Sequence, residues 1–286
     1  MVDQLSVDAP AKVNLFLRVL AAEASGYHGI ETLFCRIALA DTLRAERREG
    51  AAITIDTGGA DLGPPEANLA VRAAELVLDA TGRRFGVHLT LTKRIPVRAG
   101  LGGGSADAAA ALDLVNQLAG NAVPRAELGH FAARLGSDVA FLASGGPLAL
   151  GWGHGERLLR LPPLPRAPLL LLVPPVAIKT AVAYRWVAQA RATAAPRGAL
   201  ALDLAALGKW SDIARMAGND FESPVFGREP TIREGFEALA RSRPLLCRMS
   251  GSGSTLFAVY RTAPDRDDAK MMLGKKYGLT IATETA

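Results

Sequence analysis

The chain of 286 residues carries a formal net charge of +5, and 49% of its residues are hydrophobic. This composition is typical of a globular protein with one large or two medium-sized domains, and it excludes an intrinsically disordered chain. The basic residues are scattered, so no concentrated basic stripe indicates a nucleic-acid-binding protein. Cys35 and Cys247 lie in apolar, strand-like segments and are expected to be buried free thiols.

The sequence also argues against membrane attachment. The first residues do not form a basic segment followed by an apolar run, and the most apolar stretch, 167–178, is interrupted by prolines. That stretch is too short to cross a bilayer. We therefore expect a cytoplasmic protein with neither membrane nor nucleic acid among its partners.

The first half of the chain is predicted to mix strands and helices. Alternating apolar residues indicate strands, apolar residues at helical spacing indicate helices, and Gly or Pro marks their ends. The expected strands are 2–7 and 13–20 (around a turn at 9–12), 30–38, 42–47, 53–55 and 86–92. The expected helices are 69–80, 105–118 and 124–135.

The second half is predicted to begin after a Gly- and Pro-rich segment. Residues 145–165 contain five Gly and four Pro, which indicates a boundary, and we place the domains at 1–156 and 157–286. The elements expected beyond the boundary are strands at 169–173, 245–249, 255–260 and 279–282, and helices at 180–192, 231–241 and 265–277. A mixture of this kind is typical of an α+β sandwich.

Residues 96–107 carry the strongest functional signal. They read Pro-Val-Arg-Ala-Gly-Leu-Gly-Gly-Gly-Ser-Ala-Asp, between an expected strand and an expected helix. Glycines let backbone N–H groups approach an anion closely, and the helix N-terminus adds the positive end of its dipole. The segment predicts a phosphate-binding loop in which Ser105 can cap the helix and offer a hydroxyl to a phosphate or to Mg²⁺.

This loop differs from the common nucleotide-binding motifs. It lacks the Gly-Lys-Ser/Thr ending of a Walker A loop, and its spacing does not give the Gly-x-Gly-x-x-Gly dinucleotide fingerprint. A glycine-rich turn that merely ends a strand is the alternative. The position of the glycines directly at a helix start favours phosphate binding.

The loop resembles the second motif of the GHMP kinases (galactokinase, homoserine, mevalonate and phosphomevalonate kinases), Pro-x-x-x-Gly-Leu-Gly-Ser-Ser-Ala. Other segments resemble motifs of one branch of that family, whose alcohol substrate carries a cytidine diphosphate. In family order, these segments are 10–15, 26–34, 68–74, 136–139 and 250–254. The resemblance implies an α+β, two-domain GHMP kinase fold. Its N-terminal domain would be like domain 2 of ribosomal protein S5, its C-terminal domain would be ferredoxin-like, and the active site would lie in the cleft between them.

The resemblance also implies an activity, namely transfer of the γ-phosphoryl group of ATP to a hydroxyl of a small-molecule cytidine-diphosphate substrate, with Mg²⁺ as cofactor. In this role Asp138 would accept the hydroxyl proton, and Lys12 would keep Asp138 ionised and neutralise phosphoryl charge. The ATP site would consist of Pro96, Val97, Arg98, Ala99, Gly100, Leu101, Gly102, Gly103, Gly104, Ser105 and Ala106. The protein ligands of the metal are unknown, and the enzyme would be a monomer or a homodimer.

The substrate residues implied by the resemblance are mostly aromatic. Tyr27 and His28 would hold the cytidine, Tyr184 would stack on the other cytosine face, and Asn14 would contact the substrate. The chain departs from the family pattern at Arg98 and Ala99 and at two further positions, Ala106 and Ala140. These departures affect fine nucleotide contacts and leave the Lys–Asp pair and the glycine cradle in place.

Three alternatives stay open. Another GHMP small-molecule kinase is disfavoured by Tyr27 and His28, because homoserine, mevalonate and sugars carry no base to stack. A non-catalytic ligand-sensing protein on the same fold is disfavoured by the presence of both Lys12 and Asp138. An RNA-binding protein is disfavoured by the scattered basic charge.

Overall fold

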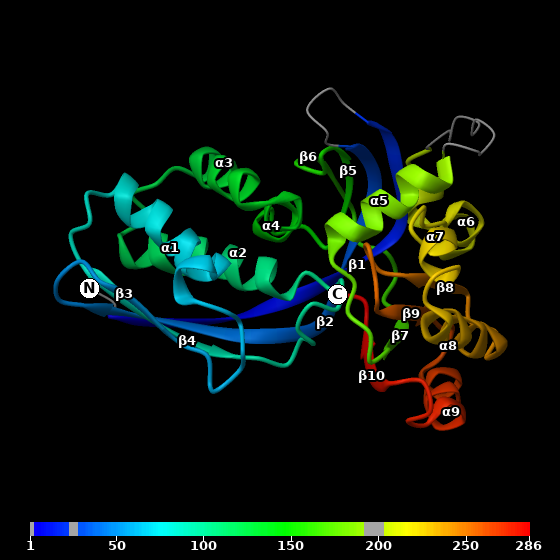
Figure 1. Ribbon diagram of the computed structural model, residues 1–286. Coiled ribbons are helices and arrows are strands. Elements are labelled where there is room, and N and C mark those ends of the chain that lie inside the picture. The colour runs from blue at the N-terminus through cyan, green and yellow to red at the C-terminus, as the bar shows by residue number, and fades with distance from the viewer. Residues whose placement is uncertain (1–2, 23–27, 192–202) are drawn as a thin grey trace.

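Two sheets, each covered by helices, make up the fold (Figure 1). The computed structural model describes residues 3–22, 28–191 and 203–286. Within them, the elements of the first sheet and its helices are β1 (Gln4–Ala22), β2 (His28–Arg48), β3 (Ile53–Asp56), α1 (Leu69–Ala80), β4 (Gly86–Thr92), α2 (Gly103–Leu118), α3 (Arg125–Leu135), α4 (Ser137–Ala143), β5 (Leu148–Gly153) and β6 (Arg157–Leu161).

The second sheet and its helices follow in the chain. These elements are β7 (Pro168–Val173), α5 (Thr180–Arg191), α6 (Trp210–Met216), α7 (Glu222–Phe226), α8 (Pro230–Arg241), β8 (Leu246–Met249), β9 (Leu256–Val259), α9 (Ala263–Leu273) and β10 (Leu279–Glu284). Short 3₁₀ helices lie at Pro65–Ala67 and Ala206–Gly208.

The first sheet is organised around β2, which pairs antiparallel with β1, β4 and β5. β3 joins β4 in parallel, and β6 joins β5 antiparallel. Helices α1 to α4 cover one face of this sheet (Figure 1). Alanines 108–111 of α2 are buried against the sheet and neighbouring helices, because their small side chains let α2 approach closely.

The second sheet is antiparallel, in the order β10-β7-β9-β8, and both faces of its central strands β7 and β9 are largely buried. Leu169 and Leu171 of β7 belong to the same apolar cluster as the first half of the chain. The alternate residues Leu170 and Leu172 pack in a second cluster with α5, α7, α8 and α9. Successive strand residues point to opposite faces, so the continuous apolar run of β7 has a structural reason: the two halves share one core.

The structure corrects several sequence-based boundaries. The expected turn at 9–12 is absent, because β1 continues through it with a register shift between Pro10 and Lys12. Proline is tolerated there since it lies at an irregularity in an edge strand. The strands expected at 30–38 and 42–47 are likewise one strand, β2.

The Gly- and Pro-rich segment 145–165 contains the β5–β6 hairpin, which sequence analysis missed. β6 pairs with β5 in the first sheet, so that sheet extends to Leu161, past the predicted domain boundary at 156/157. The division into two domains at that point stays a prediction. In the part of the chain that the structure describes, the helices are too short or too polar to span a membrane, and the cytoplasmic location also stays a prediction.

Candidate functional site

Lys12 and Asp138 form an ion pair where β1 passes the start of α4. Lys12 Nζ lies 3.2 Å from Asp138 Oδ2 and donates a hydrogen bond of 2.8 Å to Asn14 Oδ1. The lysine side chain is 3% exposed and the aspartate side chain is 31% exposed. A buried ammonium needs compensating contacts, and Lys12 finds them in Asp138, Asn14 and the Phe34 ring, 5.8 Å away. The arrangement therefore presents an accessible carboxylate held by a buried cation.

Local structure explains why these side chains meet. Gly136 ends α3, and Asp138 lies in the first turn of α4, where a negative side chain is favoured by the helix dipole. The Asn14 amide donates to Thr32 Oγ1 at 2.8 Å, and that hydroxyl donates to the Phe16 carbonyl. This chain of bonds fixes the amide orientation, so its oxygen faces Lys12.

The glycine loop begins α2 earlier than predicted. The helix starts at Gly103, with Gly102 as its N-cap at φ +71°, and no side chain caps it. Ser105 lies in the first turn and is not the cap. The first-turn N–H groups, which have no partners within a helix, are thus open to an anion.

A cavity of about 330 Å³ opens beside this loop. It is lined by every predicted ATP-site residue from Pro96 to Ser105, and also by Leu62, Ala67, Asn68, Leu69, Lys93 and Asp107. The predicted Ala106 is buried and lines a different cavity. The structure thus brings ten of the eleven predicted positions to one cavity. Ala106 is the exception, because a helix places successive residues on different faces.

The turn 250–254 closes the loop from the other half of the chain. Ser250 Oγ donates to the Gly100 carbonyl at 2.9 Å, and Thr255 N donates to the Ala99 carbonyl at 3.2 Å. A Cβ on Gly100 would lie 2.6 Å from the Ser250 carbonyl oxygen, and one on Gly251 would lie 3.6 Å from Lys12 Nζ. The close approach of these backbones explains the glycines in both motifs.

A buried ionic network supports the base of the loop, and sequence analysis missed it. Lys93 Nζ contacts carboxylate oxygens of both Asp41 and Asp107. The other Asp41 oxygen accepts backbone N–H bonds from Arg94 and Ile95, which lead into the loop. Burial raises the pKa of Asp107 to about 7, against the opposing effect of Lys93. The network ties β2, the loop entrance and α2 together; its sequence signal was Asp107, next to the glycine motif.

Gly103→Val should weaken ATP binding. A Cβ there would lie 3.0 Å from Ile95 Cγ2 and 3.3 Å from Lys93 Nζ, so a valine must push the loop into the cavity. Overpacking strain costs about 1–3 kcal/mol; if ATP binding must overcome a displacement of that size, affinity falls roughly 5- to 150-fold. Calorimetric titration of ATP measures it. The control is Gly129→Val at an exposed position of α3, where a Cβ meets nothing within 4 Å. Equal ATP affinity in both variants would remove the loop from the nucleotide site.

Aromatic side chains gather near Asp138. The rings of His28 and Tyr184 are stacked with centroids 5.5 Å apart, and Phe221 meets Tyr184 edge-on at 5.0 Å. Burial, together with the nearby charge of Asp138, raises the pKa of Tyr184. The structure thus brings two of the three predicted cytosine-binding residues together near Asp138. Tyr27 lies outside the described residues.

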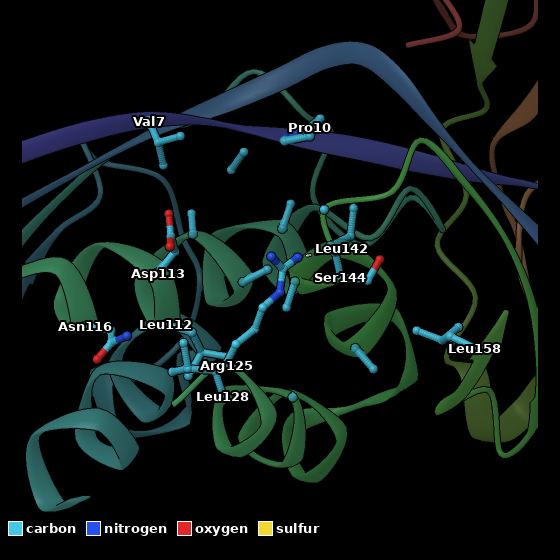
Figure 2. A pocket seen from close by; sticks show the side chains of 18 of the residues that line it. Val7, Pro10, Leu112, Asp113, Asn116, Arg125, Leu128, Leu142, Ser144 and Leu158 are labelled. Carbon is cyan, nitrogen blue, oxygen red and sulfur yellow. Dashed lines mark hydrogen bonds between the residues drawn. The ribbon is translucent and has the colours of Figure 1, made fainter. Parts of the chain in front are cut away.

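A second cavity, of about 800 Å³, lies between β1 and helices α2 to α4 (Figure 2). The side chain of Arg125 extends across it and donates to the Ser144 carbonyl at 3.2 Å. Arg160 lies 3.5 Å from the same oxygen, and Arg36 donates to the Leu142 carbonyl. Carbonyls at a helix C-terminus lack partners within the helix, so these arginines have a structural role at the end of α4.

The site has oxygen donors that suit Mg²⁺. The Ser105 hydroxyl lines the nucleotide cavity, and the Asp138 carboxylate is partly exposed. Among the described residues no group of three or more His, Cys, Asp or Glu could hold a metal by itself. This donor set fits an ion that is bound by one or two protein oxygens together with phosphate, as Mg²⁺ commonly is.

Two models of one protein family match this chain. Residues 68–147 match the family model described as GHMP kinases N terminal domain, and residues 197–278 match GHMP kinases C terminal. The chain belongs to the GHMP kinase family. It is therefore a phosphotransferase with an alcohol acceptor and ATP as phosphate donor. The predicted family and the two-domain fold are confirmed.

Individual relatives and solved structures are similar to this chain over nearly its whole length. A 4-diphosphocytidyl-2-C-methyl-D-erythritol kinase from Parvibaculum lavamentivorans is 39% identical over 270 residues, 93% of this chain and 92% of the relative. One from Moorella thermoacetica is 40% identical and covers 99% of both chains. The crystal structure of 4-(cytidine 5'-diphospho)-2C-methyl-D-erythritol kinase matches with a TM-score of 0.81 and 33% identity over 99% of both chains. A homoserine kinase from Cytophaga hutchinsonii, at 20% identity and a TM-score of 0.72, shares the fold.

Proposed function

We propose that this kinase phosphorylates the 2-hydroxyl of 4-diphosphocytidyl-2-C-methyl-D-erythritol. The observation that carries the proposal is the stacked His28–Tyr184 pair near Asp138, whose ion-pair partner Lys12 lies next to Gly102 of the phosphate-binding loop. Relatives named 4-diphosphocytidyl-2-C-methyl-D-erythritol kinase, at 39% and 40% identity, support it. A cytosine ring offers a flat face for stacking, which homoserine, mevalonate and sugars lack.

In the proposed reaction, the acceptor hydroxyl loses its proton to a carboxylate oxygen of Asp138 as it attacks the γ-phosphorus. The new O–P bond forms while the bond from phosphorus to the bridging oxygen breaks, and ADP leaves. Lys12 orients Asp138 through their 3.2 Å contact, and its charge stabilises the phosphoryl oxygens. Backbone N–H groups of the loop hold the ATP phosphates.

Mg²⁺ is the proposed cofactor, and the Ser105 hydroxyl, in the first turn of α2 at the nucleotide cavity, would hold it together with ATP phosphate oxygens. When bound, the ion neutralises charge on the phosphate oxygens. The apolar side chains of Leu62, Leu69 and Val97 line the same cavity as the loop and suit the adenine ring.

A substrate panel tests the proposal. The purified chain should phosphorylate 4-diphosphocytidyl-2-C-methyl-D-erythritol with ATP and Mg²⁺, with negligible turnover of homoserine, mevalonate and galactose. A coupled assay of ADP release, with the product identified by mass spectrometry, measures this. Comparable turnover of mevalonate would contradict the assignment, and the family membership would then stand with another acceptor.

Tyr184→Ala should weaken binding of the cytidyl substrate and leave ATP binding unchanged. Loss of base–aromatic stacking costs roughly 1–3 kcal/mol, or about 5- to 150-fold in affinity. Tyr184→Phe should retain most of the affinity, because the stacking face remains. Calorimetric titration of each ligand beside a melting curve separates stacking from stability. Equal weakening of both ligands in a destabilised alanine variant would instead make Tyr184 a packing residue.

A further inference from the structure

A largely buried segment between α6 and α7, residues 218–221, is bonded to the strand that carries Lys12. Leu17 N donates to the Gly218 carbonyl at 2.8 Å, and Asp220 N donates back to the Leu17 carbonyl at 3.0 Å. The Asp220 carboxylate also accepts a bond of 2.9 Å from Val19 N. The segment is thereby fixed against β1, five to seven residues beyond Lys12.

Asn219 connects this segment to the turn 250–254. Its Nδ2 donates to the carbonyls of Met249 and Gly251, each at 2.8 Å, and its Oδ1 accepts from Phe221 N at 2.9 Å. The residue is buried, at 7% exposure. An asparagine amide has two donor hydrogens and one acceptor oxygen, and both kinds of group are used here.

Asn219 is bonded to residues that contact two parts of the site, the surroundings of Lys12 and the aromatic cluster of Tyr184. A Cβ on Gly251 would lie 3.6 Å from Lys12 Nζ and 3.7 Å from Asn14 Oδ1, so Gly251 covers the side chains of Lys12 and Asn14. Its carbonyl is one of the two that Asn219 holds. On the other side, Phe221 meets the Tyr184 ring edge-on. The amide group of Asn219 thus lies between the turn 250–254 and the aromatic cluster.

We propose that Asn219 is a positioning residue for phosphoryl transfer, which holds the turn 250–254 over Lys12, and that Phe221 transmits the same segment's position to the acceptor subsite. The acceptor part rests on the proposed function, whereas the positioning of the turn does not. Misplacement of reacting groups by about 1 Å costs on the order of 100-fold in rate. Loss of the two bonds from Nδ2 should therefore affect the rate more than ligand affinity.

The experiment compares Asn219→Ala with Asn116→Ala. Asn116 is a matched control: its buried amide donates to the Val123 carbonyl at 3.1 Å and accepts from Val123 N at 2.9 Å. It lines the second cavity (Figure 2), whose lining includes neither Lys12 nor Asp138. Both variants should lose melting temperature, because each loses a buried amide that holds a loop. In the Asn219 variant kcat should fall about 10- to 100-fold, with a small change in either KM, while the Asn116 variant should keep wild-type kinetics.

Amide hydrogen exchange gives a readout besides activity. Ser250 N donates to the Thr255 carbonyl, and Gly253 N donates to the Ser250 carbonyl, so both amides report the order of the turn. Exchange at both should accelerate in Asn219→Ala and stay unchanged in Asn116→Ala. If the alanine variant does not fold, Asn219→Ser, which retains one donor, carries the same comparison.

Phe221→Leu tests the acceptor side of the segment. This variant should raise the KM for the cytidyl substrate several-fold and leave the KM for ATP unchanged, because Phe221 contacts the ring of Tyr184. The positioning proposal is overturned if Asn219→Ala keeps wild-type kcat and turn exchange, or if Asn116→Ala shows the same kinetic loss. A wild-type enzyme that rejects the cytidyl substrate would overturn the proposed function instead, and the exchange data would still test Asn219.

Discussion

Asp138→Asn should reduce kcat strongly and leave the affinity for both substrates nearly unchanged. Removal of a positioned general base typically costs about 10²- to 10⁴-fold in rate. Asparagine keeps the size and the hydrogen-bonding contact to Lys12 Nζ, which lies 3.2 Å from Oδ2 in the wild type. It cannot take the hydroxyl proton. An interaction made mainly in the transition state lowers kcat and kcat/KM together.

Steady-state kinetics with both substrates and a melting curve measure this effect. Asp113→Asn is the matched control, because Asp113 is an exposed helical aspartate that accepts from its neighbour Gln117. The control should keep wild-type kinetics. A nearly active Asp138→Asn enzyme would show that the carboxylate serves as a helix N-terminal residue and that the proton leaves by another route.

The sequence predicted the elements whose signals are local. The helix at 69–80 matches α1 residue for residue, and the strand at 86–92 matches β4. The glycine loop was also recognised, because glycines that allow close backbone approach are readable without knowing the fold. Lys12 and Asp138 required the family resemblance, since no local pattern brings residues 126 positions apart into contact.

Features that depend on pairing between distant segments were missed. Pro10 suggested a turn, yet β1 passes through it because β2 pairs along its whole length. The glycines of 145–165 suggested a linker, yet the β5–β6 hairpin uses them beside β2; a Cβ on Gly151 would lie 2.8 Å from the Phe34 ring. Asn219 and Lys93 gave no signal, because a buried polar residue is indistinguishable in sequence from a surface one until its partners are placed.

Lys12→Met should also reduce kcat strongly. Methionine is unbranched and of similar length, so it can fill the space of the lysine stem, while the charge is lost. The variant leaves Asn14 Oδ1 without its donor and Asp138 without its cation. Removal of one group that stabilises transition-state charge costs about 10²- to 10³-fold in kcat. Lys12→Arg should not restore the rate, since a Cβ on Gly102 would lie only 3.1 Å from Lys12 Cγ and the stem has little room to shift.

The double variant Lys12→Met/Asp138→Asn decides whether the two residues act as one unit. If Lys12 works mainly by holding Asp138 in position, its loss matters little once the carboxylate is gone. The double variant should then be about as slow as the slower single variant, because groups that act together are strongly non-additive. If Lys12 instead acts on the phosphoryl oxygens independently of Asp138, the two fold-losses should multiply. Single-turnover rates with saturating ATP measure the cycle, and multiplied losses would contradict the view that the 3.2 Å contact is what makes the pair work.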